Sequence, residues 1–242
     1  MQPARIAELL HPFLNPCPSD RPYREESAVL SATQLSDIST YIDLLLRWNA
    51  RINLTALRTA EEILTRHFGE SLFAATHLFP QPYPVTSPVP SVSPVVKDFD
   101  PAVANARVAD LGSGAGFPGV PLKLWTPAIH MTLIESNHKK STFLRELIRS
   151  LTLTGINVQT TRAESIPHTF DLVTLRAVEH FSTILPVAAR LTAPTGRLAL
   201  LIGSSQLPQA RNLLPDFPAQ IAFPIPNSDS RLLLIATRNS PQ

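Results

Sequence analysis

The fold is decided by the stretch Ala109-Asp110-Leu111-Gly112-Ser113-Gly114-Ala115-Gly116-Phe117-Pro118-Gly119. The chain has only 8 glycines, and four of them lie within this one short segment. The apolar run 107–111 predicts a strand before the glycines, and the run 119–125 predicts a helix after them, with proline tolerated in its first turn. A glycine turn between strand and helix lets the backbone approach a nucleotide-like ligand, because a Cβ would block the turn or the ligand.

Two ligand classes are compatible with this turn. The spacing Gly114-x-Gly116-x-x-Gly119 matches the dinucleotide fingerprint and predicts an NAD-dependent oxidoreductase. The spacing Asp110-x-Gly112-x-Gly114-x-Gly116 is instead that of class I S-adenosylmethionine (SAM) methyltransferases. The second pattern fits better, because its first glycine directly follows the strand. Its acid at the strand end would also disfavour a pyrophosphate but suit a ligand with sulfonium and ammonium charges.

Either ligand needs an acid at the end of the next strand to hold the ribose diol. The run His130–Glu135 predicts that strand, and Glu135 at its end comes at about the expected twenty residues from the glycines. We therefore predict that Glu135 binds the ribose, the alternative being a solvated loop carboxylate.

Composition limits the remaining possibilities. At 242 residues and 44% hydrophobic content the chain has enough apolar side chains for a core. A net charge of +2 permits nucleic-acid binding without requiring it. The single cysteine, Cys17, excludes an internal disulfide and a multi-cysteine zinc site, and we predict no metal site. The sequence has no signal peptide and no apolar run of about 18 residues, so we expect a cytoplasmic protein without membrane spans.

Three regions follow one another along the chain. We predict a helical extension packed on the catalytic domain over 1–79, with capping boxes at Ser31 and Thr59, and a Pro-rich loop or linker over 80–105. From 106 to 242 strands and helices alternate, which predicts a Rossmann-like, doubly wound α/β sheet that is mostly parallel and closes with an antiparallel hairpin. The expected strands are 107–111, 131–135, 156–160, 170–174, 196–202, 219–223 and 231–237, and the expected helices 119–125, 138–153, 179–191 and 206–213.

Several stretches together resemble one family. They are Arg47-Trp48-Asn49, Asn53-Leu54-Thr55, Arg66-His67, the glycine stretch through Pro121, Ile134-Glu135-Ser136, Lys139-Lys140, Arg162-Ala163-Glu164 and Arg176-Ala177. In this order they look like the bacterial small-subunit (16S) rRNA guanine-N7 methyltransferases, also called glucose-inhibited division protein B. The resemblance runs from about Ser31 to Thr237, outside the Pro-rich segment.

The resemblance implies a class I SAM-dependent enzyme that methylates N7 of one guanine in 16S rRNA, free or in the small ribosomal subunit. It implies that Gly112, Gly114 and Phe117 line the methionine and ribose side of the cofactor. It also implies that Ala163 and Glu164 meet the adenine and that Arg176 lies near the cofactor at the end of its strand. An ion pair between Arg176 and Glu179 is the alternative for that arginine. A monomer is expected.

The substrate side is predicted from residue type and position. Asn53, Arg66 and His67 are candidates to hold the guanine or its phosphate, the alternatives being a turn residue, a surface ion pair and a packed imidazole. Lys139 and Lys140 open a helix, where cations oppose the helix dipole, and this favours a role with RNA phosphate over a merely solvated basic face. We assign no catalytic base, because N7 of guanine carries a lone pair and no proton.

Two departures from the family pattern stand out. Ile202-Gly203 occurs where the family commonly has Lys-Gly, which predicts a missing basic contact and leaves open a non-catalytic RNA-binding module with a degenerate cofactor site. Glu70 occurs where aspartate is frequent, which is a mild change.

Overall fold

The computed structural model describes residues 1–15, 28–80, 105–176 and 181–238. The predicted Pro-rich loop lies outside these ranges except for its end residues 80 and 105. Glu179 also lies outside them. The strands are β1 (Arg107–Leu111), β2 (His130–Ile134), β3 (Ile156–Gln159), β4 (Phe170–Arg176), β5 (Thr192–Gly203), β6 (Ala219–Pro224) and β7 (Arg231–Thr237). The helices are α1 (Pro3–Leu14), α2 (Ala32–Asn49), α3 (Ala60–Glu62), the π-helix η2 (Ile63–Gly69), α4 (Glu70–Leu78), α5 (Gly119–Trp125), α6 (His138–Ser150), the 3₁₀ turns η3 (Ala163–Ser165) and η4 (Ser204–Gln206), α7 (Phe181–Leu191) and α8 (Leu207–Leu213).

All seven strands form one sheet in the order β3-β2-β1-β4-β5-β7-β6. The first five are parallel, and β7 pairs antiparallel with both β5 and β6. The predicted doubly wound sheet with a terminal antiparallel hairpin is confirmed. Because the chain order reverses between β1 and β4, the carboxyl ends of these two strands border the crevice where such sheets bind ligands.

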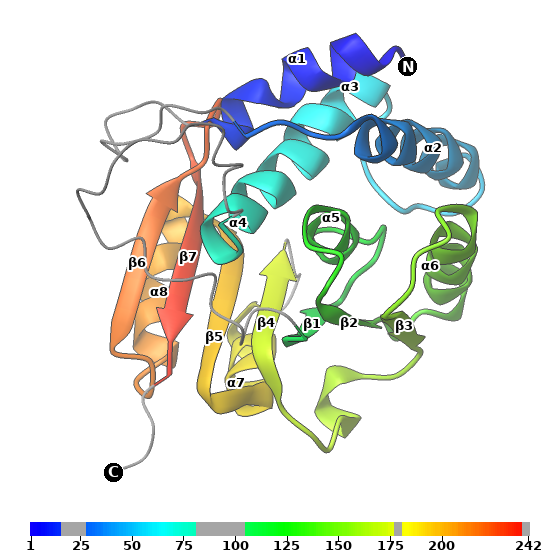
Figure 1. Ribbon diagram of the computed structural model, residues 1–242. Helices are drawn as coiled ribbons and strands as arrows, with labels where there is room; N and C mark the ends of the chain where they lie inside the picture. Colours follow the sequence, from blue (N-terminus) through cyan, green and yellow to red (C-terminus); the bar gives the residue numbers. More distant parts are fainter. Residues whose placement is uncertain (16–27, 81–104, 177–180, 239–242) are drawn as a thin grey trace, which may run out of the picture.

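Helices cover both faces of the sheet (Figure 1). One apolar core joins α1, α2, η2 and α4 to α5, α6 and one face of the strands, so the N-terminal helices share their core with that face. The other core lies between the opposite face and helices α7 and α8. Alternation of side chains along each buried strand supplies both cores at once.

Two helices begin where the sequence predicts, but the second of them is not a regular α-helix along its length. Ser31 and Thr59 each form the predicted capping box. The single helix expected after Thr59 is instead divided into α3, the π-helix η2 and α4. A π-helix widens the turn locally and occurs frequently at functional sites. Here it carries Arg66 and His67.

Candidate active site

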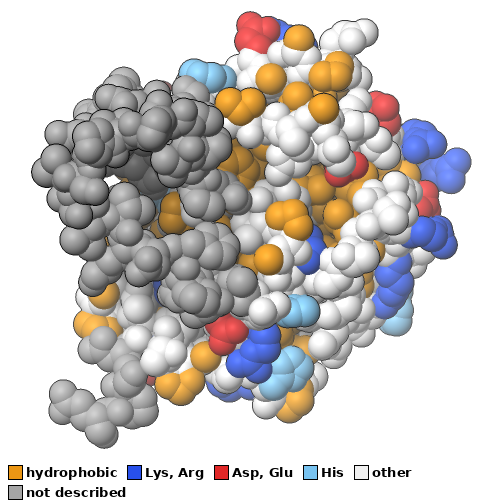
Figure 2. Space-filling view, viewed as in Figure 1, with side chains coloured by type: hydrophobic (Ala, Val, Ile, Leu, Met, Phe, Trp, Pro, Cys, Tyr) orange, Lys and Arg blue, Asp and Glu red, His pale blue; other side chains and the backbone are white. Residues whose placement is uncertain are grey.

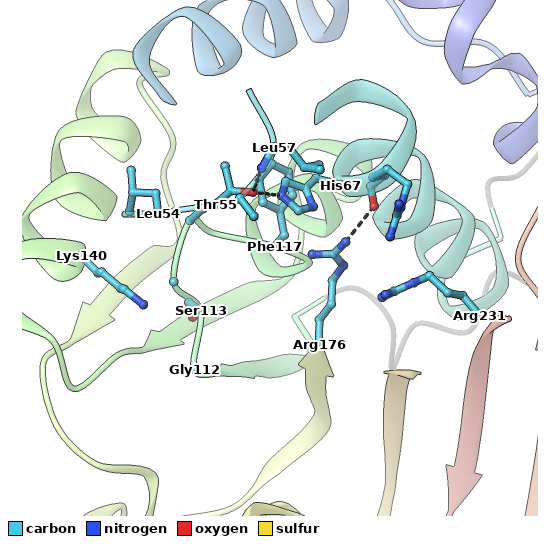
Figure 3. A pocket seen from close by; sticks show the side chains of 14 residues that line it. Leu54, Thr55, Leu57, His67, Gly112, Ser113, Phe117, Lys140, Arg176 and Arg231 are labelled. Atoms are coloured by element: carbon cyan, nitrogen blue, oxygen red, sulfur yellow. Dashed lines mark hydrogen bonds between the residues drawn. The ribbon is translucent and has the colours of Figure 1, made fainter. Parts of the chain in front are cut away.

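A cavity of about 370 Å³ lies at the carboxyl ends of β1 and β4 (Figure 3). It is bounded by the loop after α2, the π-helix, the glycine turn after β1, the first turn of α6 and the ends of β4 and β7. Its lining residues are Leu54, Thr55, Ala56, Leu57, Arg66, His67, Gly112, Ser113, Gly114, Ala115, Phe117, Lys140, Arg176 and Arg231. This set contains four cations and no carboxylate, so the cavity suits an anionic or electron-rich ligand.

The glycine turn is shaped by its own backbone and by a helix of the extension. Gly114 lines the cavity and has φ +56°; a Cβ there would lie 3.7 Å from the Gly112 carbonyl oxygen, so the backbone conformation, and not a lack of space, favours glycine. Gly116 has φ +93°, and a Cβ there would lie 2.5 Å from the Tyr41 hydroxyl. That hydroxyl donates to the Ala115 carbonyl at 2.5 Å, and the Tyr41 ring stacks on Phe117 at 5.1 Å. The cofactor turn is thus held by α2.

Asp110 lies beneath the turn and not in the cavity wall. Its carboxylate is fully buried and accepts hydrogen bonds from the Gly119 amide and the Thr174 hydroxyl. Burial raises the pKa of Asp110 to about 7, against the lowering effect of these hydrogen bonds. The side chain of Asp110 therefore joins the start of α5 and strand β4 to the turn, and the prediction that an acid at this strand end suits a cationic ligand stays a prediction.

Glu135 follows β2 and connects the turn to the start of α6. Its Oε2 accepts the Gly114 amide at 2.9 Å, and its Oε1 accepts the Asn137 amide at 2.8 Å. Each carboxylate oxygen keeps accepting capacity after these bonds. The side chain is buried and is not part of the cavity lining.

The loop opposite the glycine turn is organised by Asn49, which the sequence placed in the motif Arg47-Trp48-Asn49 without a role of its own. The Asn49 side-chain oxygen accepts the Leu54 and Thr55 amides at 2.9 and 3.0 Å. Its side-chain amide donates to the Thr55 and Leu57 carbonyls at 3.0 and 3.3 Å. Four hydrogen bonds from one buried side chain fix the segment 54–57 as a wall of the cavity.

His67 presents a neutral ring in this wall. Its Nε2 lies 2.7 Å from Thr55 Oγ1, and its ring lies 4.8 Å from that of Phe117 (Figure 3). Burial, together with the charges of Arg176, Arg66 and Arg231, lowers the pKa of His67 to about 2. The imidazole is therefore uncharged at physiological pH, and Nδ1 is buried without a hydrogen-bond partner.

A single carboxylate, Glu70, gathers the arginines of the cavity. Glu70 is buried in the first turn of α4, and Arg176 of β4 donates to its Oε2 through Nε and Nη2 at 3.2 and 3.0 Å. Arg231 Nε lies 2.8 Å and Arg66 Nε 3.6 Å from Glu70 Oε1. Arg176 also donates to the Arg66 carbonyl (Figure 3). We call these four residues the Glu70 cluster; three guanidinium charges against one carboxylate leave it cationic.

Comparison with known proteins identifies the family. The model of the family described as GidB, rRNA small subunit methyltransferase G, matches residues 34–82 and 91–217. The chain belongs to this family. Among its relatives, a ribosomal RNA small subunit methyltransferase G from Xanthomonas euvesicatoria pv. vesicatoria (strain 85-10) is 36% identical over 176 residues, covering 72% of this chain and 71% of that protein. One from Xylella fastidiosa (strain 9a5c) is 31% identical over 209 residues, covering 86% and 87%.

A solved structure supports the fold alone. The ribosomal protein L11 methylase of Lactobacillus delbrueckii subsp. bulgaricus aligns with a TM-score of 0.53 at 14% identity, over 72% of this chain and 79% of that one. Membership of the methyltransferase G family decides against the oxidoreductase alternative. Gly119 is packed against the Asp110 and Leu133 side chains beneath α5, a packing role that a glycine at this position also has in dinucleotide-binding folds.

Some of the residues predicted to bind the cofactor of this methyltransferase G member line the cavity, and the others lie outside its lining. Gly112, Gly114, Phe117 and Arg176 line the cavity. Glu135 stands behind Gly114, as described above. Ala163 and Glu164 lie in η3, outside the lining.

The turn η3 is held in place by an arginine that sequence analysis did not single out. Arg190 of α7 donates to the carbonyls of Ala163, Glu164 and Ile166 at 3.3, 3.1 and 3.1 Å. A cation at the carbonyl end of a helical turn also complements the turn's dipole. Arg190 therefore fixes the segment that was predicted to meet the adenine.

The predicted substrate residues divide in the same way. Arg66, His67 and Lys140 line the cavity, whereas the exposed Asn53 and Lys139 lie outside the lining. Arg231, which sequence analysis missed, lines it too. Two signals could have found it: it opens the last predicted strand, and an antiparallel hairpin places that position beside the carboxyl end of the preceding strand.

The two departures from the family pattern have structural accounts. Ile202 is buried in the apolar core beneath α7 and α8, so this position is not an empty basic contact of the cavity. Arg231 pairs with the neighbouring Gly203 in the β5–β7 ladder and supplies a cation there. Glu70 is more than a mild change, because its carboxylate organises three arginines.

Two further findings concern the described ranges. No helix in them is long and apolar enough to span a bilayer. No group of His, Cys, Asp or Glu side chains within them is arranged to hold a metal ion.

Proposed function

We propose that this methyltransferase G member transfers the methyl group of SAM to N7 of one guanine in 16S rRNA, free or assembled in the small subunit. The observation that carries the proposal is the cavity at the β1–β4 switch point, bounded on one side by the glycine turn and on the other by a neutral aromatic wall and cations. We further propose that it acts as a monomer in the cytoplasm. Large exposed apolar side chains in the described residues are few and scattered, namely Met1, Val29 and Ile221.

The residues present fit SAM. The cavity volume lies within the range of about 300–1,000 Å³ typical of small-molecule sites. The backbone of Gly114, which lines the cavity, would lie against the cofactor, and Glu135 would accept the ribose hydroxyls through its remaining lone pairs. Arg176, which lines the cavity, would pair with the carboxylate of the methionine part.

Methyl transfer to N7 of guanine requires no proton transfer by the protein before the attack. SAM supplies a methyl group already activated on a positively charged sulfur. N7 of guanine offers a lone pair without a proton, so the chain's task is to hold the base in line and exclude water, which can supply roughly 7–11 kcal/mol in the best cases. Phe117 and neutral His67 would form an aromatic wall for the base.

The charge of the product sets a second requirement. Methylation at N7 makes the purine cationic. A protonated imidazole beside it would oppose that charge, and the low pKa of His67 prevents this. The remaining guanidinium charge of the Glu70 cluster is suited to RNA phosphate, with Arg66 and Lys140 as the proposed contacts on the two sides of the cavity.

Binding and transfer can be tested separately. Calorimetric titration should show binding of SAM and no binding of NADH. Methyl-labelled SAM should then label small-subunit RNA or particles that lack their N7-methylguanine, and not those already modified. SAM binding without transfer to either form of the substrate would contradict the proposed acceptor.

A further inference from the structure

A row of cations, four of them exposed and Lys140 half-buried, borders the mouth of the cavity. Arg51 and Arg58 flank the loop that forms one wall, and Arg47 lies at the end of α2 just before it. Lys140 lines the cavity on the other side, and Lys139 precedes it in the first turn of α6. We call these five residues the basic rim. Figure 2 shows Lys and Arg side chains gathered along the right-hand edge of the molecule, where Figure 1 places α2 and α6.

Packing brings the two parts of the rim to one side of the protein. The Trp48 ring lies edge-on against Phe143 at 5.9 Å, which joins the end of α2 to the first half of α6. Trp48 is the neighbour of Arg47 in sequence, and Phe143 lies about one helical turn beyond Lys139 and Lys140. Both parts also border the same cavity, since segment 54–57 and Lys140 line it together.

The charges of the basic rim are not neutralised within the protein. Among described residues, the ion pairs of at most 4.0 Å engage the arginines at 5, 66, 107, 176, 231 and 238 and no member of the rim. Glu61 and Glu62, the nearest acids along the loop, are bound to Arg5 and to the Thr59 cap. Within the described residues Arg47 and Arg58 donate to the backbone carbonyls of Asp43 and Thr55, and no carboxylate lies within ion-pair distance of a rim side chain, so the charges of the rim can attract an external polyanion.

The first turn of α6 carries its cations at a cost. Asn137 caps this helix through the Lys139 and Lys140 amides at 2.9 and 3.2 Å, and the first turn contains no acidic residue. Cations there oppose the helix dipole, whereas a phosphate would be attracted by the dipole and by both ammonium groups. The placement disfavours the isolated helix and favours the helix with an anion bound beside it.

We propose that the basic rim is the track along which the rRNA backbone reaches the cavity, with phosphates on both sides of the target nucleotide held by the α2 loop and by α6. The inference rests on the proposed function and specifies the surface through which that substrate enters. The target base enters the cavity between the two halves of the rim.

Salt dependence of RNA binding tests the track. Affinity of unmodified small-subunit RNA is measured at several salt concentrations for the wild type, Arg51→Gln, Lys139→Gln and the double variant. Each single substitution should weaken binding about three- to tenfold and reduce the slope of log K against log salt by roughly 0.7 to 1, with the two effects adding in the double variant. SAM affinity should stay unchanged.

The matched control is Arg149→Gln, which removes a cation from the last turn of the same helix, about 15 Å along its axis from Lys139. It should leave affinity and slope unchanged. Wild-type slopes in Arg51→Gln and Lys139→Gln, or an equal loss in Arg149→Gln, would overturn the track. A wild-type protein that neither binds nor methylates the RNA would instead overturn the proposed function.

Discussion

The Tyr41 hydroxyl donates a hydrogen bond to the Ala115 carbonyl, which joins a helix of the N-terminal extension to the turn that faces the cofactor cavity. The same tyrosine ring stacks on Phe117, and its hydroxyl occupies the space that a side chain at Gly116 would need. The extension therefore takes part in shaping the cofactor turn in addition to packing beside the sheet.

Removing that hydroxyl should loosen the turn. Tyr41→Phe keeps the ring but leaves a buried carbonyl without its donor, which should lower the free energy of unfolding by about 1–3 kcal/mol. We expect SAM affinity to fall about tenfold, because the turn is no longer held in its binding conformation. Calorimetry and denaturant unfolding measure the two effects.

Thr192→Val provides the control for this change. It deletes a buried hydroxyl that donates to the Ala188 carbonyl at 2.9 Å, on the face of the sheet that carries α7. It should cost similar stability and leave SAM affinity intact. Equal SAM affinity in Tyr41→Phe and the wild type would remove Tyr41 from the cofactor site.

The pKa of His67 makes the protein sensitive to acid. The folded state holds this imidazole neutral down to about pH 2, whereas the unfolded chain protonates it near its ordinary pKa of about 6.5. The contribution of His67 is thus complete above pH 6.5 and is lost progressively as the pH falls below it. The stability difference between the wild type and His67→Gln should shrink from pH 7 to pH 4. The exposed His138→Gln serves as control, and a difference that does not vary with pH would contradict the assigned pKa.

Arg190 should act on SAM affinity and little on turnover. Arg190→Met frees the segment Ala163–Ile166, so we expect KM for SAM to rise about tenfold while kcat changes less than about twofold, as for loss of uniform binding. Arg238→Met is the matched control, since Arg238 donates to the carbonyls of Ala189 and Thr192 at the same C-terminal end of α7 but makes no hydrogen bond to η3. That variant should lose stability without a change in KM. A parallel rise of KM in both variants would mean that Arg190 supports only α7.

Restoring the family's lysine should harm this protein. Ile202→Lys places an ammonium group in the apolar core beneath α7 and α8, which should cost about 3 kcal/mol or more of stability. Methyl transfer should not increase, because Arg231 already supplies a cation to the cavity from the paired strand. Thermal unfolding and initial rates decide this, and a stable, faster Ile202→Lys enzyme would show that position 202 reaches the site.

Local sequence patterns were sufficient to predict most of the fold. The glycine turn, the two capping boxes and the alternation of apolar runs depend on neighbouring residues, and they predicted the parallel sheet and its hairpin correctly. The π-helix was missed because one widened turn leaves the spacing of apolar residues almost unchanged.

The site could be predicted only in part, because several of its contacts join residues that are far apart in the sequence. Tyr41, Glu70 and Arg190 act on residues far along the chain, and no local pattern announces such a contact. Asp110 was placed at the correct strand end, but sequence position could not tell a ligand-facing carboxylate from one buried beneath the turn. Whether Ala163, Glu164 and Glu135 touch the cofactor stays a prediction.

The central claim is that one guanine of 16S rRNA is methylated at N7. The most direct test incubates unmodified small-subunit RNA and particles with the protein and SAM, and then maps chain cleavage that is specific for N7-methylguanine. The account predicts cleavage at a single guanine, dependent on SAM and abolished in Arg176→Met. Label incorporated without N7-specific cleavage, or cleavage scattered over many guanines, would contradict it.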